Sequence, residues 1–318
     1  MPAPRILFVK LSSLGDVVHH LPAVSELHAH LPNARIAWAV EEGYARLIAL
    51  HPAVSQVIPV GLRGLRSQPW DAQRWSHLAE ARRKLRAETW DYVIDTQGLV
   101  KSGLIARMAR GRTHGLDTSS ARERAATIFY DERYGVPRDL HAVERNRRLV
   151  ASAMGYEMKG PPRYGLVAPP SRPSWAPEGA YAVMLQAASR EAKRWPEDNW
   201  IALATRLARS GIASVFPGGT DEERATAARI AAAVPDAMAA PPMDLDTAAA
   251  LLGHASRVAG VDTGLTHLAV ALDRPTVGIY RATRPALTGL HGASGTNLGG
   301  PGETPSAEAV AAAMRLPP

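Results

Sequence analysis

Cysteine is absent from the 318 residues of this chain. Disulfides, thiolate metal ligands and cysteine nucleophiles are therefore excluded, and a reducing cytoplasm is compatible with the composition. Only three Phe are present and no nucleic-acid-binding motif is recognisable, so we expect no nucleic-acid partner. No apolar run approaches the roughly 20 residues that a membrane span needs, and no basic-then-apolar leader precedes the first predicted strand. We expect a protein that is soluble or bound to a membrane surface.

The signature motifs of several enzyme classes are also missing. The sequence contains neither the G-x-G-x-x-G pattern of dinucleotide-binding proteins nor the G-x-x-x-x-G-K-[ST] loop of P-loop proteins. It also lacks H-E-x-x-H and G-x-S-x-G. These absences disfavour classical dehydrogenases, P-loop kinases, zinc proteases and α/β-hydrolases.

Positive charge is concentrated in one part of the chain. The net charge is +7, and residues 61–148 contain 18 Lys and Arg against 11 Asp and Glu, an excess as large as that of the whole chain. Such a region indicates an anionic partner. Two other interpretations remain open: charges spread over solvated helix faces, or a non-catalytic basic module that binds nucleic acid or an anionic membrane.

Short apolar runs alternate with helical patterns along the whole sequence. Arg5–Val9, for example, has the composition of a parallel strand that is buried on both faces. Further strands are predicted at Arg35–Val40, Gln56–Val60, Tyr92–Asp95, Tyr181–Gln186, Ile212–Phe216, Arg257–Val261 and Thr276–Tyr280. Helices are predicted at Arg74–Ala87, Lys101–Ala109, Leu140–Met154, Glu197–Arg209, Asp221–Ala233, Leu245–Ala255, Leu265–Leu272 and Ser306–Arg315. The alternation predicts an α/β fold with right-handed crossovers and doubly wound parallel sheets.

A proline-rich stretch divides the alternation into two parts. Six prolines fall between residues 160 and 177, where they can neither continue a helix nor donate to a sheet ladder. We therefore predict an N-terminal domain at 1–160, a linker at 161–178 and a C-terminal domain at 179–318. Whether the last helix packs back on the N-terminal domain is left open.

Two polar turns lead from a predicted strand into a helix. Residues Val261–His267 read Val-Asp-Thr-Gly-Leu-Thr-His, and Lys10–Asp16 read Lys-Leu-Ser-Ser-Leu-Gly-Asp. Such turns direct backbone N–H groups and the positive end of a helix at a ligand, which suits a phosphate. Asp16 is either an ordinary first-turn acid or a base that takes a proton from a hydroxyl, and Gly15 lets the backbone approach a ligand.

Three further segments carry candidate ligand-binding residues. Ser189 and Lys193 follow a strand and suit a diphosphate, although a surface loop would look similar. A glycine turn precedes Glu222 and Glu223, and either acid could bind ribose hydroxyls or simply favour the helix start. The Asp244-Leu-Asp246 pattern binds metal in some glycosyltransferases, but here we expect Asp244 to cap a helix and expect no metal.

Together, several of these stretches resemble the ADP-heptose lipopolysaccharide heptosyltransferase family. They are Lys10–Asp16, Glu41–Gly43, Val93–Ser102, Lys193–Glu197 and Val261–His267. The segments Gln97–Ser102 and His141–Arg145 point more narrowly to members that attach the first heptose to the Kdo of lipid A. The resemblance implies a GT-B fold, in which two Rossmann-like domains face an interdomain cleft, and inverting transfer without a metal or another cofactor.

The resemblance also implies roles for individual residues. Asp16 matches the catalytic base, and basic or polar positions near the anionic acceptor are Ser13, Gly15, Arg63, Arg66, Lys101 and Arg122. The positions that match contacts to ADP-heptose are Ser189, Lys193, Glu223 (with Glu222 as the alternative), Met243, Asp262, Thr263, Gly264 and His267.

This chain departs from the family at Gln186, at Ala188 and at Arg281–Pro285, where an acid and a glycine are lost. We expect transfer of L-glycero-D-manno-heptose from ADP-heptose to Kdo-lipid A in lipopolysaccharide inner-core synthesis. The alternative is another nucleotide sugar or a later core position. The expected location is the cytoplasm, peripheral on the anionic cytoplasmic face of the inner membrane.

Overall fold

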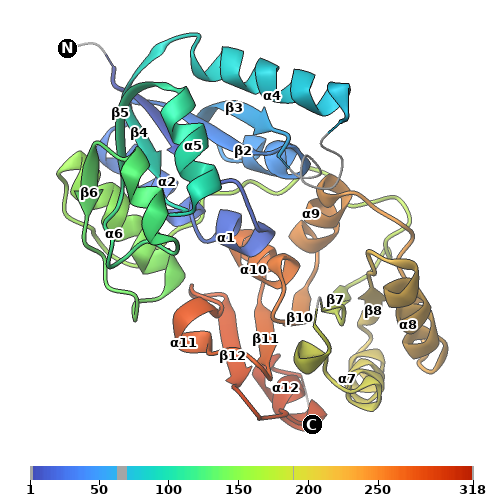
Figure 1. The fold of residues 1–318 in the computed structure, drawn as a ribbon. Helices are drawn as coiled ribbons and strands as arrows, with labels where there is room; N and C mark the ends of the chain where they lie inside the picture. The colour runs from blue at the N-terminus through green and yellow to red at the C-terminus, as the bar shows by residue number, and fades with distance from the viewer. Residues whose placement is uncertain (1–2, 63–69, 189, 317–318) are drawn as a thin grey trace. The chain divides into compact units, whose positions relative to one another are not determined.

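The computed structural model describes residues 3–62, 70–188 and 190–316, with only the backbone for residues 72–74. It divides into two compact units, residues 1–166 and 167–318. Figure 1 draws the first unit in blue to green and the second in yellow to red. Between 155 and 180, where six prolines lie, the structure has neither a helix nor a strand. No helix in the described part of the chain is both long and apolar enough to cross a membrane.

The first unit is built on one parallel sheet of six strands in the order β3-β2-β1-β4-β5-β6. The strands are β1 (Arg5–Val9), β2 (Arg35–Glu41), β3 (Val54–Val60), β4 (Thr89–Asp95), β5 (Arg110–Leu116) and β6 (Glu132–Tyr134). The α-helices are α1 (Leu14–Val18), α2 (Leu21–His30), α3 (Ala45–Ala49), α4 (Ala72–Leu85), α5 (Val100–Met108) and α6 (Ala142–Met154). Short 3₁₀ segments are η1 (Glu42–Tyr44) and η2 (Arg124–Phe129).

The second unit repeats this arrangement, with a parallel sheet in the order β12-β11-β10-β7-β8-β9. Its strands are β7 (Tyr181–Leu185), β8 (Ala213–Phe216), β9 (Ala237–Ala239), β10 (Arg257–Val261), β11 (Thr276–Tyr280) and β12 (Gly295–Gly299). Its helices are η3 (Glu191–Lys193), α7 (Glu197–Arg209), α8 (Asp221–Ala232), α9 (Leu245–Gly253), α10 (Gly264–Ala271), α11 (Pro285–Thr288) and α12 (Ala307–Ala313). The predicted α/β class with two doubly wound parallel sheets is therefore confirmed.

Apolar side chains cover the faces of both sheets. In the first unit, α4 and α5 pack on one face with Leu7, Val9 and Val93, while α2 and α6 contact each other. In the second unit, α7, α8 and α12 cover one face around the buried Trp200 and Phe216. The last helix, α12, thus packs on α7 of its own unit. Because the central strands such as β1, β7 and β10 are buried on both faces, their ends are where polar residues can reach a ligand.

Strands at or near the sheet edges are what the sequence analysis missed. The strands β5, β6, β9 and β12 were not predicted, and each is an edge strand or, for β5, the neighbour of one. The segment Arg110–Leu116 reads Arg-Gly-Arg-Thr-His-Gly-Leu and has no apolar run, yet it pairs in parallel with β4. Pairing with a neighbouring strand, rather than its own composition, gives this segment its conformation.

Candidate functional site

Each sheet has a switch point, where successive strands are added on opposite sides of the first one. In the first unit the switch point lies between β1 and β4, and in the second between β7 and β10. Both sheets have the Rossmann strand order, counted within each unit as 3-2-1-4-5-6, and ligands of such sheets bind beyond the carboxyl ends at the switch point. The polar turns Lys10–Asp16 and Val261–His267 both begin there.

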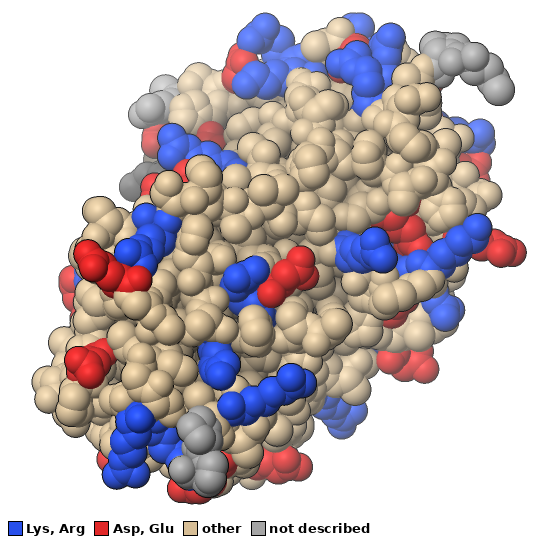
Figure 2. Space-filling model, turned by 180° about the vertical axis from the view of Figure 1, so that it is seen from behind, with Lys and Arg blue, Asp and Glu red and all other residues tan. Residues whose placement is uncertain are grey.

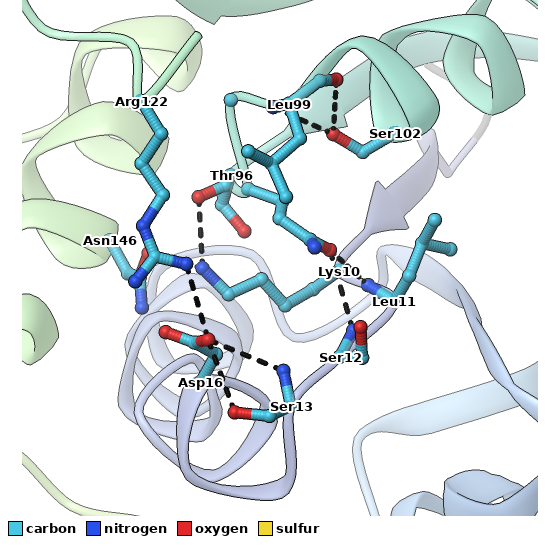
Figure 3. A network of polar contacts seen from close by, with 12 residues as sticks. Lys10, Leu11, Ser12, Ser13, Asp16, Thr96, Leu99, Ser102, Arg122 and Asn146 are labelled. Atoms are coloured by element: carbon cyan, nitrogen blue, oxygen red, sulfur yellow. Dashed lines mark hydrogen bonds and ion pairs between the residues drawn. The ribbon is translucent and has the colours of Figure 1, made fainter. Parts of the chain in front are cut away.

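Asp16 lies in the first turn of α1, directly after β1. Its Oδ2 accepts hydrogen bonds from the Ser13 backbone N–H at 3.3 Å and the Ser13 hydroxyl at 3.4 Å. The guanidinium of Arg122 donates to the same oxygen at 3.3 Å (Figure 3). Burial opposes ionisation, but the positive charges of Lys10 and Arg122 outweigh it, so the pKa of Asp16 lies below its ordinary value. Asp16 is thus a carboxylate at neutral pH.

Lys10, at the end of β1, is a buried cation on the same side of the turn. Its Nζ donates to the Thr96 carbonyl at 2.9 Å and to Asn146 Oδ1 at 3.3 Å. In Figure 3 the side chain runs between these partners toward Asp16. Burial lowers the pKa of Lys10 to about 8, although the nearby Asp16 carboxylate opposes the shift.

The loop after β4 holds the turn after β1 in place. Gln97 Oε1 accepts hydrogen bonds from the backbone N–H groups of Leu11, at 2.6 Å, and Ser12, at 3.4 Å. Asp95 in turn fixes this loop, because its Oδ1 accepts from the Gln97 N–H at 2.8 Å and its Oδ2 accepts from the Tyr130 hydroxyl at 2.7 Å. Asp95 is fully buried, and burial raises its pKa. Asp95 therefore stabilises the loop that holds the Asp16 turn in place.

Some of the predicted acceptor residues lie together in the structure, and others lie outside its described part. Arg122 and Ser13 contact Asp16 directly, and Gly15 lies in the same turn. Lys101 Nζ donates to the Ser12 hydroxyl at 3.1 Å, which places this exposed cation beside them. The structure therefore brings four predicted positions together, whereas Arg63 and Arg66 lie outside the described residues.

Several cations of the basic segment 61–148 pair with acids of the same segment. Arg83, Arg107 and Arg112 form surface ion pairs with Glu80, Asp131 and Glu132. On the face drawn in Figure 2, Lys and Arg stand in small groups, several of them beside Asp or Glu. These pairs leave the net excess of the segment unchanged, because both partners of each pair belong to it, and the Arg122 and Lys101 side chains stay exposed at the turn.

In the second unit, Asp262 is the centre of the polar cluster that follows β10. Its Oδ2 accepts from Lys193 Nζ at 2.7 Å and from the Thr283 hydroxyl at 2.8 Å, and Oδ1 lies 3.4 Å from His267 Nε2. Burial opposes ionisation, but the bonds from His267, Lys193 and Thr283 outweigh it and hold the pKa of Asp262 below its ordinary value. The ion pair fixes Lys193 at the carboxyl end of β10.

The start of α10 presents the turn that the sequence analysis singled out. Thr263 is the N-cap and Gly264 the first helical residue, so the first N–H groups of α10 are at the switch point. The Thr266 hydroxyl bonds back to the Val261 carbonyl at 2.7 Å. A Cβ at Gly260 would stand 2.3 Å from that hydroxyl, which explains the glycine in β10.

The two candidate ribose acids have different surroundings. Glu223 forms a capping box with Thr220, in which its Oε2 accepts from the N–H groups of Gly219 at 2.8 Å and Thr220 at 3.1 Å. Glu222 is 74% exposed and pairs with Arg194 at 3.2 Å. Helix capping is therefore confirmed for Glu223, and the geometry leaves open which acid contacts a ribose.

Asp244, the first acid of the Asp244-Leu-Asp246 pattern, has the role that the sequence predicted. It is the N-cap of α9, and its Oδ1 accepts from the Thr247 N–H at 2.8 Å and the Thr247 hydroxyl at 2.6 Å. Met243 precedes it and is half-buried. Ser189, the remaining predicted donor contact, lies outside the described residues.

The atypical segment Arg281–Pro285 is tied into the Asp262 cluster. Thr283 supplies one of the bonds to Asp262, and Arg281 donates to the Thr304 hydroxyl at 3.0 Å and to the Arg194 carbonyl. The sequence analysis missed Thr283 as a member of the cluster, as it missed Lys10, Gln97 and Asn146 at the Asp16 turn. Three of these residues share a signal, because Lys10, Gln97 and Thr283 each follow a predicted strand by a few residues.

Fold and turns together define a class of protein, namely two Rossmann-like units that each carry a polar, phosphate-compatible turn at the switch point. Comparison with known proteins identifies this class as glycosyltransferases. The family model for glycosyltransferase family 9 (heptosyltransferase) matches residues 70–314, and the chain belongs to this family.

Individual relatives agree with this assignment over most of their length. Lipopolysaccharide heptosyltransferase 1 of Escherichia coli strain K12 is 41% identical over 292 residues, 91% of each chain. The protein of the same name from Pseudomonas aeruginosa PAO1 is 40% identical over 301 residues, 93% of this chain and 83% of its own. Among solved structures, E. coli heptosyltransferase WaaC with ADP has a TM-score of 0.90 and 38% identity, covering 98% of this chain and 99% of its own.

Proposed function

We propose that the chain is a heptosyltransferase that transfers L-glycero-D-manno-heptose from ADP-heptose to the Kdo of lipid A, the first heptose of the lipopolysaccharide inner core. The observation that carries the proposal is the identity of about 40% to proteins named lipopolysaccharide heptosyltransferase 1, over 91% of this chain. A solved relative with a TM-score of 0.86 contains ADP-2-deoxy-2-fluoro heptose, which supports a nucleotide-heptose donor.

The chemistry requires a base for the acceptor and a counter-charge for the leaving group. Asp16 takes the proton of the acceptor hydroxyl while that oxygen forms a bond to the anomeric carbon. The bond from this carbon to the diphosphate oxygen breaks, ADP leaves with the electron pair from the opposite face, and the configuration inverts. The charge that develops on ADP is offset by Lys193 and by the N–H groups at Thr263 and Gly264, and the proposal therefore needs no metal ion.

The acceptor carries acidic groups, and the cations at the Asp16 turn fit them. Arg122, with a side chain that is 51% exposed, can exchange Asp16 for a carboxylate of the sugar, and Lys101 lies beside it. Arg63 and Arg66 are proposed to contribute on the basis of family resemblance alone. The donor contacts proposed on the same basis include Ser189, Met243 and one of Glu222 and Glu223.

Mass-spectrometric detection of heptose on Kdo-lipid A, after incubation with ADP-heptose, tests the proposal directly. A donor panel that includes other nucleotide sugars, and an acceptor panel that includes a core already carrying one heptose, accompany it. If product forms only with another donor, or only on the longer core, the proposed substrates are wrong. The panels are included because the Arg281–Pro285 segment departs from the family pattern. Activity that survives exhaustive chelation supports transfer without a metal, and activity restored only by added metal contradicts it.

We further propose peripheral binding to an anionic membrane surface, where the acceptor is located. The excess of positive charge in residues 61–148 supports this, since each well-placed Lys or Arg contributes about 1 kcal/mol. Flotation with vesicles of phosphatidylglycerol at low salt should carry the protein upward, and neutral vesicles should not. Equal behaviour with both kinds of vesicle would refute an electrostatic interaction.

A further inference from the structure

Two cations act on Asp16, and they differ in how tightly they are held. The side chain of Arg122 is 51% exposed and makes one hydrogen bond to the carboxylate, at 3.3 Å. Lys10 as a residue is only 5% exposed and is held by the Thr96 carbonyl and Asn146 Oδ1. Figure 3 shows Arg122 reaching Asp16 from a loop, whereas the Lys10 side chain extends from the strand end between Thr96 and the Asp16 carboxylate. Arg122 can therefore move away from Asp16, whereas Lys10 is held in place.

Several charged groups surround Lys10, and Asp16 is the acid that stays open to a ligand. Arg122 and Arg145 are cations, and His20 lies close enough for Lys10 to depress its pKa further after burial has lowered it. The other acid, Asp95, is fully buried and accepts hydrogen bonds from Tyr130, Gln97 and Gly98. An ammonium group has three donors and Lys10 uses two in its hydrogen bonds, so its charge is only partly satisfied by them.

The reaction creates a need for a fixed cation at this point. If an acidic group of the acceptor takes Arg122, as the proposed function implies, Asp16 loses the one ion pair that it forms among the described residues. Its own burial would then favour the protonated acid, which cannot act as a base. A cation that stays in place when the acceptor binds prevents this protonation of Asp16.

We propose that Lys10 is a positioning residue, which keeps Asp16 ionised while the acceptor occupies Arg122. The inference rests on the proposed function, and it assigns the two cations different roles. Arg122 is the exchangeable partner that selects an acidic acceptor, and Lys10 is the permanent counter-charge of the base. The direction of the pKa shift of Asp16, which Lys10 and Arg122 both lower, agrees with this division.

The test compares full-length K10M, R122Q and the wild-type protein, with K84M as the matched control. Lys84 lies on α4 and pairs with Glu80, so K84M removes one lysine charge elsewhere in the same unit. The kcat profile between about pH 3 and pH 8 reports the complex with acceptor, and kcat/KM reports the unliganded enzyme; this range includes the acidic limb of an Asp16 whose pKa lies below 3.8. Removing a nearby positive charge raises the pKa of Asp16, so the acidic limb of K10M should move up by about one to two pH units in both profiles.

The variants of the two cations should give different pH profiles in this experiment. R122Q should shift the limb in kcat/KM and raise the KM for the acceptor, but leave the kcat limb in place, because Arg122 has already left Asp16 in the complex. K84M should follow the wild type. A kcat for K10M that falls by the same factor at every pH would indicate a merely structural role and overturn the proposal.

A measurement on the unmodified protein does not depend on activity or on the folding of a variant. Burial lowers the pKa of Lys10 to about 8, so the ¹³C shift of the Asp16 carboxyl, followed by NMR between pH 6 and pH 10, should show a step as Lys10 loses its proton. A flat Asp16 signal across that range overturns the inference while leaving the proposed function intact. Absence of heptose transfer by the wild-type protein would instead remove the proposed function.

Discussion

Asp16 and Asp262 both lie at the switch point of a sheet with the same strand order, Asp16 after the first strand of its unit and Asp262 after the fourth, and their surroundings differ. Asp262 is 10% exposed and both of its oxygens interact with neighbouring side chains, those of Lys193, Thr283 and His267. Asp16 is 22% exposed, and all of its described hydrogen bonds converge on one oxygen. The switch point thus holds a carboxylate bound through both oxygens in one unit and a more accessible one in the other.

The difference indicates which acid can react. A carboxylate with both oxygens bound by neighbouring side chains is an anchor, and Asp262 holds Lys193 in place. A carboxylate with an open oxygen and an exchangeable cation can accept a proton from a substrate. The predictions that follow test this division between reacting and anchoring aspartates.

Replacing Asp16 with Ala should have the largest effect. We expect turnover to fall by roughly 10²–10⁴-fold, the range for loss of a general base, while the affinity for ADP stays unchanged. Steady-state heptose transfer and calorimetric titration with ADP measure the two quantities. Near-normal turnover in this variant would remove Asp16 as the base.

Replacing Asp262 with Asn should instead weaken donor binding. Lys193 loses its ion pair and is no longer fixed at the end of β10, so we expect the Kd for ADP to rise by roughly 10- to 100-fold, equivalent to one charge-assisted hydrogen bond. Calorimetry with ADP is the measurement, and D16N serves as the control. An ADP affinity equal to that of the wild type would show that Asp262 does not organise the donor turn.

The two acids of α8 should differ in the same assay. We expect Glu223→Gln to weaken ADP by roughly tenfold, the cost of a hydrogen bond to a charged group, and Glu222→Gln to leave it unchanged. Gln can still form the capping box, so the melting temperature of E223Q should stay close to that of the wild type. The reverse order of ADP affinities would assign the ribose contact to Glu222.

Acid stability should show the smallest and most specific effect. The pKa of Asp262 in the folded protein lies below the ordinary value of 3.8, so its stabilising contribution is present above about pH 4 and is lost as the pH falls below that. The decrease in the free energy of unfolding between pH 5 and pH 3 should therefore be smaller in D262N than in the wild type. Urea denaturation at both pH values gives this difference, and equal decreases would contradict it.

Sequence patterns were sufficient for the central elements of the fold. The bounds predicted for β1, α7, β10 and β11 agree with the structure at both ends. These segments have apolar runs or amphipathic periods that their own burial requires. The outer strand β12 was missed because Gly295–Gly299 contains two glycines and few apolar residues, and its conformation depends on pairing with β11.

The candidate site likewise contains residues that local sequence patterns predict and residues that they do not. The turns at Asp16 and Asp262 could be predicted because a glycine, hydroxyls and an acid follow a strand in each. Asn146 could not be predicted, since it lies 136 residues from its partner Lys10 and belongs to an otherwise ordinary helix. Thr283 meets Asp262 across 21 residues in a segment that departs from the family pattern.

The sequence by itself determined the α/β class, the central strands and the two polar turns, because burial of a parallel strand and the chemistry of a helix start are local requirements. Only the tertiary structure decided which charges meet. It buried Lys10 near Asp16, left Arg122 exposed and bound both oxygens of Asp262 to neighbouring side chains. Burial and distance set the pKa and availability of a carboxylate, and both depend on segments that are far apart along the chain.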